Sequence, residues 1–206
     1  MKRRRHSREE SFHRRTLPGA APGTVAVDPE APRPLVRLVA YDAERCLERD
    51  APNLKQVATL RADHAVVWLD LDGLGDRETI LHVGEIFGLH QLALEDVVNV
   101  HQRPKLENYQ DYLFLVARMP IPGEERLLTE QLSLFLGRDF VVTFQEGVPG
   151  DCLDPVRLRL RDSSRRIRAK GADFLAYSIL DSLVDSYFPL LEAYGERLEA
   201  LEDEVL

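Results

Sequence analysis

The chain has 206 residues, of which 44% are hydrophobic and 30% charged, a composition typical of a folded, water-soluble protein. The formal net charge of -8 disfavours a protein whose overall surface binds nucleic acid. Two distant cysteines, Cys46 and Cys152, form no CxxC pattern, so we expect neither a disulfide framework nor a thiolate zinc site. No run approaches the roughly 18–20 apolar residues of a membrane helix, and no apolar signal segment follows the basic N-terminus. We therefore expect the printed chain neither to cross a membrane nor to be exported.

The first 34 residues have the composition of a disordered tail. Their first half is rich in arginine, and five prolines lie between Pro18 and Pro34. Prolines at that density cannot sustain a helix or an interior strand. We predict a solvated, basic and proline-rich tail over residues 1–34. The alternative is that the arginines contact nucleic acid or an anionic lipid surface.

Regular structure is predicted from Leu35 onward. Alternating apolar and polar residues over Leu35–Tyr41 predict a strand, and the β-rich run Ala65–Leu71 predicts another that ends in a glycine turn. Asp76 is a good N-cap for a helix that ends at Gly88. A second, shorter helix is predicted over Gln91–Val98.

Three further strands and a basic helix follow. The strands are predicted over Tyr109–Met119, Glu130–Leu136 and Phe140–Gln145. The turn Gly137-Arg138-Asp139 predicts that the last two strands form a hairpin. An arginine-rich helix is predicted over Pro155–Ala169, with proline at its first position.

The last segment predicts one long helix from Ala172 to Leu206. At about 1.5 Å per residue this helix is roughly 50 Å long, and Pro189 is expected to kink it without ending it. It ends in acidic residues with no C-cap, so we expect the natural protein to continue as a helical stalk beyond Leu206. Apolar residues recur in alternating steps of three and four, a heptad pattern that predicts packing against another helix: Tyr177, Leu180, Val184, Tyr187, Leu191, Tyr194, Leu198, Leu201 and Val205.

No pattern of catalytic residues is recognisable. The chain has no GxGxxG or Walker loop, no GxSxG motif and no HExxH motif. The aspartates around Gly73 fail the spacing of a calcium loop, so a turn at a strand end is the better interpretation. We expect a protein that is not an enzyme.

Four carboxylates are candidate metal ligands. Glu95 and Asp96 are neighbours on the short helix and point about 100° apart, so they suit two nearby ions, or one ion completed by another element. Asp181 and Asp185 are spaced i and i+4 on the long helix and share one face. From spacing alone, solvated or capping carboxylates are the simpler interpretation of all four.

A family resemblance changes that interpretation. The run GEIFGLHQLALEDVVNVHQRPKLENYQDYLFLVARM, residues 84–119, closely resembles the cytoplasmic domain of CorA magnesium transporters. Three later runs match in the same order, at Phe140–Glu146, Asp154–Arg161 and Ala172–Phe188. The chain is similar to this family over roughly residues 35–206.

The resemblance implies a fold of the α/β class and a place in a larger assembly. An α/β/α sandwich with a mixed sheet is expected over residues 35–170, and a long stalk helix over residues 171–206. Beyond the printed chain it implies two membrane helices separated by a Gly-Met-Asn loop. Members of the family form homopentamers in the cell inner membrane, with this part facing the cytoplasm, and conduct Mg²⁺ and often Co²⁺ or Ni²⁺.

The resemblance also assigns ligands and a role. Asp96 matches the principal carboxylate of a divalent-ion site between subunits, and Glu95 and Asp181 match the second site. Asp185 is a candidate by its spacing from Asp181. The expected function is regulation by Mg²⁺ bound at these interfaces, and Co²⁺ is an alternative ion.

Three alternatives stay open. The first is the zinc-transporting branch of the same family, which shares this architecture. The second is a divalent-cation-binding or helix-mediated interaction protein without a pore. The third is a nucleic-acid binder that uses the tail and the Arg157–Arg168 helix, which the net charge of -8 disfavours.

Overall fold

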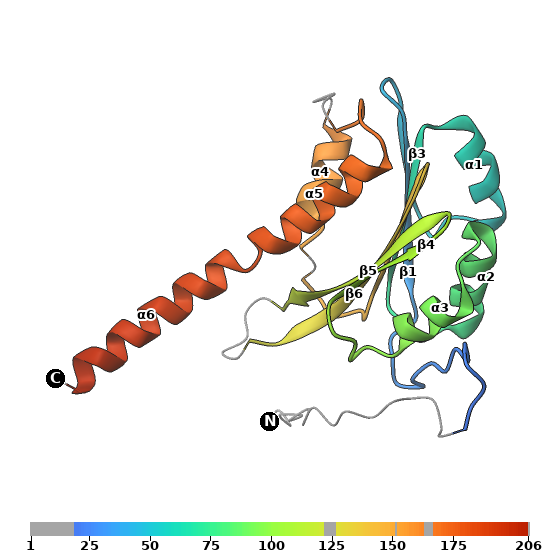
Figure 1. Ribbon diagram of the computed structural model, residues 1–206. Helices are drawn as coiled ribbons and strands as arrows, with labels where there is room; N and C mark the ends of the chain where they lie inside the picture. Colours follow the sequence, from blue (N-terminus) through green and yellow to red (C-terminus); the bar gives the residue numbers. More distant parts are fainter. Residues whose placement is uncertain (1–18, 122–126, 151, 163–166, 206) are drawn as a thin grey trace, which may run out of the picture.

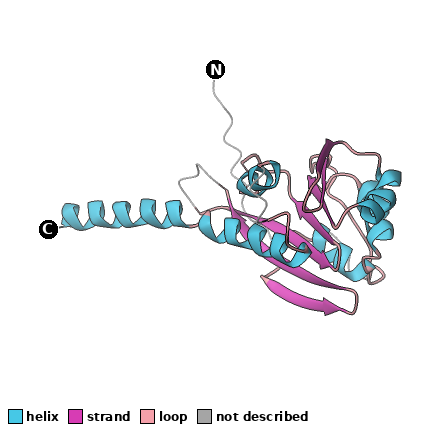
Figure 2. Cartoon of the chain, turned by 90° about the horizontal axis from the view of Figure 1, so that it is seen from above, coloured by secondary structure: helices cyan, strands magenta, loops and turns pink. Residues whose placement is uncertain are grey.

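A mixed seven-stranded sheet with helices on both faces forms the body of the chain, and a long helix extends away from it (Figures 1 and 2). The computed structural model describes residues 19–121, 127–150, 152–162 and 167–205. This architecture confirms the predicted α/β class, the sandwich with a mixed sheet and the long C-terminal helix. Within the described ranges no helix has the length and apolar character needed to span a bilayer.

The sheet consists of two antiparallel halves joined by one parallel pair. Its strand order is β2-β1-β3-β7-β6-β5-β4, and only β3 and β7 run parallel. A parallel pair needs a long crossover, and here the chain between β3 and β7 supplies two helices and the other half of the sheet. The strands are β1 Leu35–Tyr41, β2 Cys46–Asp50, β3 Val66–Asp72, β4 Lys105–Tyr109, β5 Tyr112–Pro120, β6 Thr129–Gly137 and β7 Phe140–Gln145.

Two hydrophobic cores lie on the two faces of the sheet. One core packs the sheet against a short 3₁₀ turn and three helices, and the other packs it against two helices. The first set is η1 Leu54–Gln56, α1 Val57–Asp63, α2 Arg77–Phe87 and α3 Gln91–Val98. The second set is α4 Asp154–Arg161 and α5 Ala172–Asp185, and α6 Phe188–Val205 continues beyond the sheet.

The helices α2 and α3 have the limits that the sequence predicts. The Asp76 side chain accepts hydrogen bonds from two backbone N–H groups of the first turn of α2, and Gly88 ends the helix in the left-handed conformation at φ 67°. The His90 side chain caps α3. Gly84 permits close packing of the two helices, because a Cβ there would lie 2.5 Å from Leu94 Cδ1.

Two predicted elements have limits that differ from the observed ones, and several elements were not predicted. The strand predicted over Tyr109–Met119 corresponds to β5, which begins at Tyr112, and the preceding strand β4, which pairs with it as a hairpin, was not predicted. The basic helix ends at Arg161, where Asp162 is extended, rather than at Ala169. The edge strand β2, the turn η1 and the helix α1 were not predicted.

The predicted single long helix is two helices, α5 and α6, separated at Ser186 and Tyr187. Pro189 lies in the first turn of α6 and has no N–H to donate to the carbonyl of Asp185, which removes a bond that would join the helices. Helix α5 packs on the sheet, whereas α6 exposes Leu191 and Leu198. The stalk therefore begins at α6.

The segment before β1 is the other difference. Residues 1–18 of the predicted tail lie outside the described residues. Residues 19–34 contain no helix or strand, as the prolines predict. The Val25 side chain is nevertheless buried in the same core as α2 and α3. We expected order to begin at Leu35, but the chain already packs against the domain at Val25, ten residues earlier.

Candidate metal-binding residues

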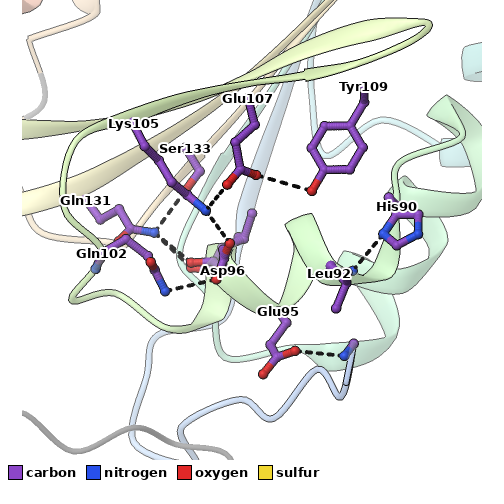
Figure 3. A network of polar contacts seen from close by, with 12 residues as sticks. His90, Leu92, Glu95, Asp96, Gln102, Lys105, Glu107, Tyr109, Gln131 and Ser133 are labelled. Atoms are coloured by element: carbon purple, nitrogen blue, oxygen red, sulfur yellow. Dashed lines mark hydrogen bonds and ion pairs between the residues drawn. The ribbon is translucent and has the colours of Figure 1, made fainter. Parts of the chain in front are cut away.

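Asp96 lies near the C-terminal end of α3, with 26% of its side chain exposed. Its two oxygens have different partners (Figure 3). Lys105 Nζ is 2.5 Å from Asp96 Oδ2, and Gln102 Nε2 donates to Asp96 Oδ1 at 3.0 Å. Gln102 lies between α3 and β4, and Lys105 is the first residue of β4. The carboxylate is therefore oriented by its own chain and remains in contact with solvent.

Lys105 joins two carboxylates. Its ammonium also donates to Glu107 Oε1 at 2.8 Å, while the Tyr109 hydroxyl donates to Glu107 Oε2 at 3.2 Å. Partial burial lowers the pKa of Lys105, but the hydrogen bonds to Asp96 and Glu107 outweigh it and raise the pKa above its usual value. Lys105 is therefore a stable positive charge beside Asp96.

Gln131 fixes the end of α3 to the sheet. This residue of β6 is buried, and its Nε2 donates to the Asp96 carbonyl oxygen at 2.9 Å and to Ser133 Oγ at 3.0 Å. Its Oε1 accepts from the Gln102 backbone N–H at 3.2 Å. Sequence reasoning did not single out Gln131. The available signal was a glutamine within a predicted strand, because a buried amide needs partners.

Glu95 has a different environment from its neighbour. It is buried, and its Oε2 accepts the Gly23 N–H at 2.7 Å, so that it holds the N-terminal segment on α3. Gly23 has φ +82°, and a Cβ there would lie 3.0 Å from Gln91 Cβ, so glycine suits this close approach. Glu95 and Asp96 point to different partners (Figure 3).

Asp181 and Asp185 lie on the opposite side of the sheet from α3, because α5 belongs to the second core. Asp181 is half-buried and its Oδ1 accepts from the Tyr177 hydroxyl at 3.4 Å, while Asp185 is exposed one turn later. Figure 1 shows α5, which carries both carboxylates, on the other side of the sheet from α3, the helix of Glu95 and Asp96.

The candidate ligands do not converge within one chain. Among the described residues there is no group of three or more His, Cys, Asp or Glu side chains placed to hold a metal ion. Carboxylate and amide oxygens are nevertheless the hard donors that Mg²⁺ prefers, and Mg²⁺ commonly binds one or two carboxylates while keeping several waters. The donor chemistry at Asp96 fits such an ion, provided that water or another chain supplies the other ligands.

Solved structures with this fold define its class. The structure of the soluble domain of CorA from Methanocaldococcus jannaschii superposes with a TM-score of 0.63 at 20% identity, covering 82% of this chain and 64% of that one. The structure of the full-length CmaX protein gives a TM-score of 0.68 at 18% identity, covering 85% of this chain and 53% of that one. The fold is therefore that of the soluble part of CorA.

Sequence comparison identifies the family. The family model described as CorA-like Mg²⁺ transporter protein matches residues 63–206. The cobalt/magnesium transport protein CorA of Thermotoga maritima is 40% identical over 173 residues, which are 83% of this chain and 49% of that protein. The chain belongs to the CorA-like Mg²⁺ transporter family, as the resemblance of residues 84–119 indicated. It spans about half the length of the Thermotoga maritima relative.

Proposed function

We propose that this chain is the cytoplasmic regulatory part of a longer CorA-type transporter of the inner membrane, which carries Mg²⁺ and also Co²⁺ or Ni²⁺. In this proposal Mg²⁺ bound at Asp96, between subunits of a homopentamer, reports the internal concentration of the ion. The observation that supports the proposal is the Asp96 carboxylate, which the family resemblance suggests as a ligand and which is oriented and partly exposed at the end of α3.

The geometry of one chain supports an interfacial site. Asp96 offers one carboxylate and the described residues of the same chain offer no cluster to complete it. A site with one carboxylate from each of two chains and several waters binds Mg²⁺ weakly, which suits a sensor of free ion at millimolar concentration. Bound ions would neutralise facing carboxylates, and their loss would leave like charges in repulsion.

The gating mechanism proposed is negative feedback. High internal Mg²⁺ would hold neighbouring domains together and keep the pore closed, and loss of the ion would let the domains separate. Glu95 and Asp181 belong to the proposed second ion site, with Asp185 as a further candidate. An ion at Glu95 would share the carboxylate with the Gly23 N–H, which Glu95 Oε2 already accepts.

The direct test is Asp96→Ala in the full-length transporter, assayed by the inhibition of Mg²⁺ uptake by internal Mg²⁺. We expect the concentration of internal Mg²⁺ that halves the uptake to rise several-fold, because each interface loses a charged ligand. Glu85→Ala is the matched control, since Glu85 is an exposed carboxylate on the neighbouring helix α2. Inhibition that is the same for Asp96→Ala as for the parent would contradict the proposal.

A further inference from the structure

The Asp96 carboxylate already has a cation beside it. Lys105 Nζ lies 2.5 Å from Asp96 Oδ2, and the two side chains are 25% and 26% exposed. Any ion that binds this carboxylate directly has to displace the ammonium or share the oxygens with it. The carboxylate is therefore a site for which a cation of the same chain competes.

Lys105 has a second carboxylate within reach. Glu107 Oε1 accepts from Lys105 Nζ at 2.8 Å, and the Tyr109 hydroxyl holds the other oxygen of Glu107 at 3.2 Å. The ammonium also lies 5.4 Å from the centre of the Phe114 ring, a favourable place for a cation. When an ion takes Asp96, Lys105 can stay paired with Glu107, so its displacement needs only a small movement and leaves no lone charge.

The charge of the competing ion decides the outcome. A monovalent ion brings the same charge as the ammonium and must also lose water, so it gains little by the exchange. A divalent ion brings twice the charge to the same oxygens and can displace the ammonium at sufficient concentration. An internal lysine that must be displaced thus lowers the affinity of the carboxylate for every ion by about the same factor, and an ion that binds weakly, as a monovalent ion does, is then no longer bound.

We propose that Lys105 is a built-in competitor for Asp96, which sets the affinity of this carboxylate for divalent cations and excludes monovalent ones. This inference rests on the proposed function, because it takes Asp96 as a ligand. It adds a residue that sets how strongly an ion must bind in order to occupy Asp96, but that does not itself bind the ion. Glu107 is the alternate partner that holds Lys105 when Asp96 is occupied.

The test is Lys105→Gln in the full-length protein, with Mg²⁺ alone as ligand and calorimetry as the readout of binding. We expect Mg²⁺ to bind roughly five- to tenfold more tightly, as suits the loss of one partly exposed competing charge. Lys105→Arg keeps the charge and should retain an affinity close to that of the parent. Adding Asp96→Asn to Lys105→Gln should remove the gain. Damage to the fold lowers affinity, so the expected tightening cannot come from misfolding.

Glu107→Gln supplies a prediction of the opposite sign. Without Glu107 the ammonium has Asp96 as its remaining carboxylate partner in this contact, so Mg²⁺ should bind more weakly than to the parent. If the effect acts through Lys105, it disappears when Glu107→Gln is placed in the Lys105→Gln protein. An equal loss in both backgrounds would make Glu107 a ligand and overturn its role as the alternate partner of Lys105.

The outcomes separate this inference from the proposed function. If parental binding depends on Asp96 but Lys105→Gln binds Mg²⁺ no more tightly, the competitor role is wrong and the proposed function stands. If Asp96→Asn leaves Mg²⁺ binding unchanged in both backgrounds, Asp96 is not a ligand and both proposals fall. Competition of K⁺ with Mg²⁺ for the parent site at matched ionic strength would overturn the exclusion of monovalent ions.

Discussion

The adjacent carboxylates Glu95 and Asp96 lie in different environments. Asp96 is partly exposed beside a lysine, whereas Glu95 is buried and accepts the Gly23 N–H. Their directions differ by about 100° because they are consecutive on a helix, so one faces the strand β4 and the other faces the segment before β1. The same short run therefore supplies an outward carboxylate and an internal tether.

Glu130 is a third carboxylate with an unusual environment. It is buried at the start of β6, and burial, together with the nearby carboxylates of Glu146 and Asp72, raises its pKa to about 8. The N–H groups of Glu146 and Val148 oppose this shift by donating to the carboxylate. Near neutral pH Glu130 is therefore mostly protonated in the folded chain.

A raised pKa makes stability depend on pH. Because the folded pKa lies above the unfolded one, Glu130 stabilises the fold fully below about pH 4.5, and this contribution is lost as the pH rises through about 8. The shift sets an upper bound of about 5 kcal/mol. We predict that Glu130→Gln gains in free energy of unfolding relative to the parent between pH 5 and about pH 8, measured by urea unfolding. Parallel pH profiles for the two proteins would contradict the shift.

At the scale of elements, one buried ion pair joins α4 to the sheet. Asp70 on β3 and Arg157 on α4 are both almost fully buried, and Arg157 Nη2 lies 2.5 Å from Asp70 Oδ2. Thr143 and Gln145 of β7 donate to the other oxygen of Asp70 at 2.6 and 2.9 Å. The pair and its hydrogen bonds therefore link the helix to the central parallel strands, and they explain why Asp70 is not part of a calcium loop.

Removal of one partner of this pair should be costly. We predict that Arg157→Met destabilises the chain by about 3 kcal/mol, because Asp70 is left charged in the interior. Arg159→Met is the matched control, since Arg159 is exposed on the same helix, and it should cost less than about 1 kcal/mol. Addition of Asp70→Asn to Arg157→Met should recover part of the loss in chemical unfolding. Equal losses for the two arginine variants would show that the buried pair has no special role.

Local signals explain which elements sequence reasoning could predict. Helices α2 and α3 carry their own caps, so their limits were correct. The turn between β4 and β5 is Gln110-Asp111, which contains neither glycine nor asparagine, and sequence reasoning therefore began the strand too early, at Tyr109, and missed β4. The division of α5 from α6 depends on where α5 leaves the sheet as well as on Pro189, and periodicity cannot report that position.

In the candidate site, too, local patterns could be predicted from the sequence, whereas contacts between distant segments could not. Asp96 was found from a family motif, which is a local pattern. Its contact with Lys105 depends on the position of β4 beside α3, and its contact with Gln131 crosses from β6. Contacts of this kind require the sheet order, which the sequence pattern did not supply. The role of Glu95 as a tether likewise depends on the path of residues 19–34.

At the scale of the whole molecule, the main feature is the exposed apolar face of α6. Its apolar side chains Phe188, Leu191, Leu198 and Leu201 are each more than half exposed. Its described contacts with the body include the Tyr194 hydroxyl, which accepts the Leu127 N–H at 3.0 Å. An isolated helix of this size gains little stability in water, and most helices depend on packing of an apolar face. In the proposed homopentamer, α6 helices of several copies would cover one another.

The same surfaces predict how association responds to ions. We expect the 206-residue chain to be a monomer or weak oligomer without divalent ions, and its mass in solution to rise as Mg²⁺ is added. Asp96→Ala should remove the response to Mg²⁺, because the proposed ion no longer neutralises facing carboxylates. Replacement of Leu191 and Leu198 by serine should instead weaken association at every Mg²⁺ concentration, because it removes apolar area that is independent of the ion.

Light scattering during a Mg²⁺ titration, with K⁺ at matched ionic strength as control, distinguishes the two effects. A parental mass that stays constant throughout the titration would contradict ion-linked assembly of this domain, and a mass that rises equally in Asp96→Ala would place the responsible ion elsewhere.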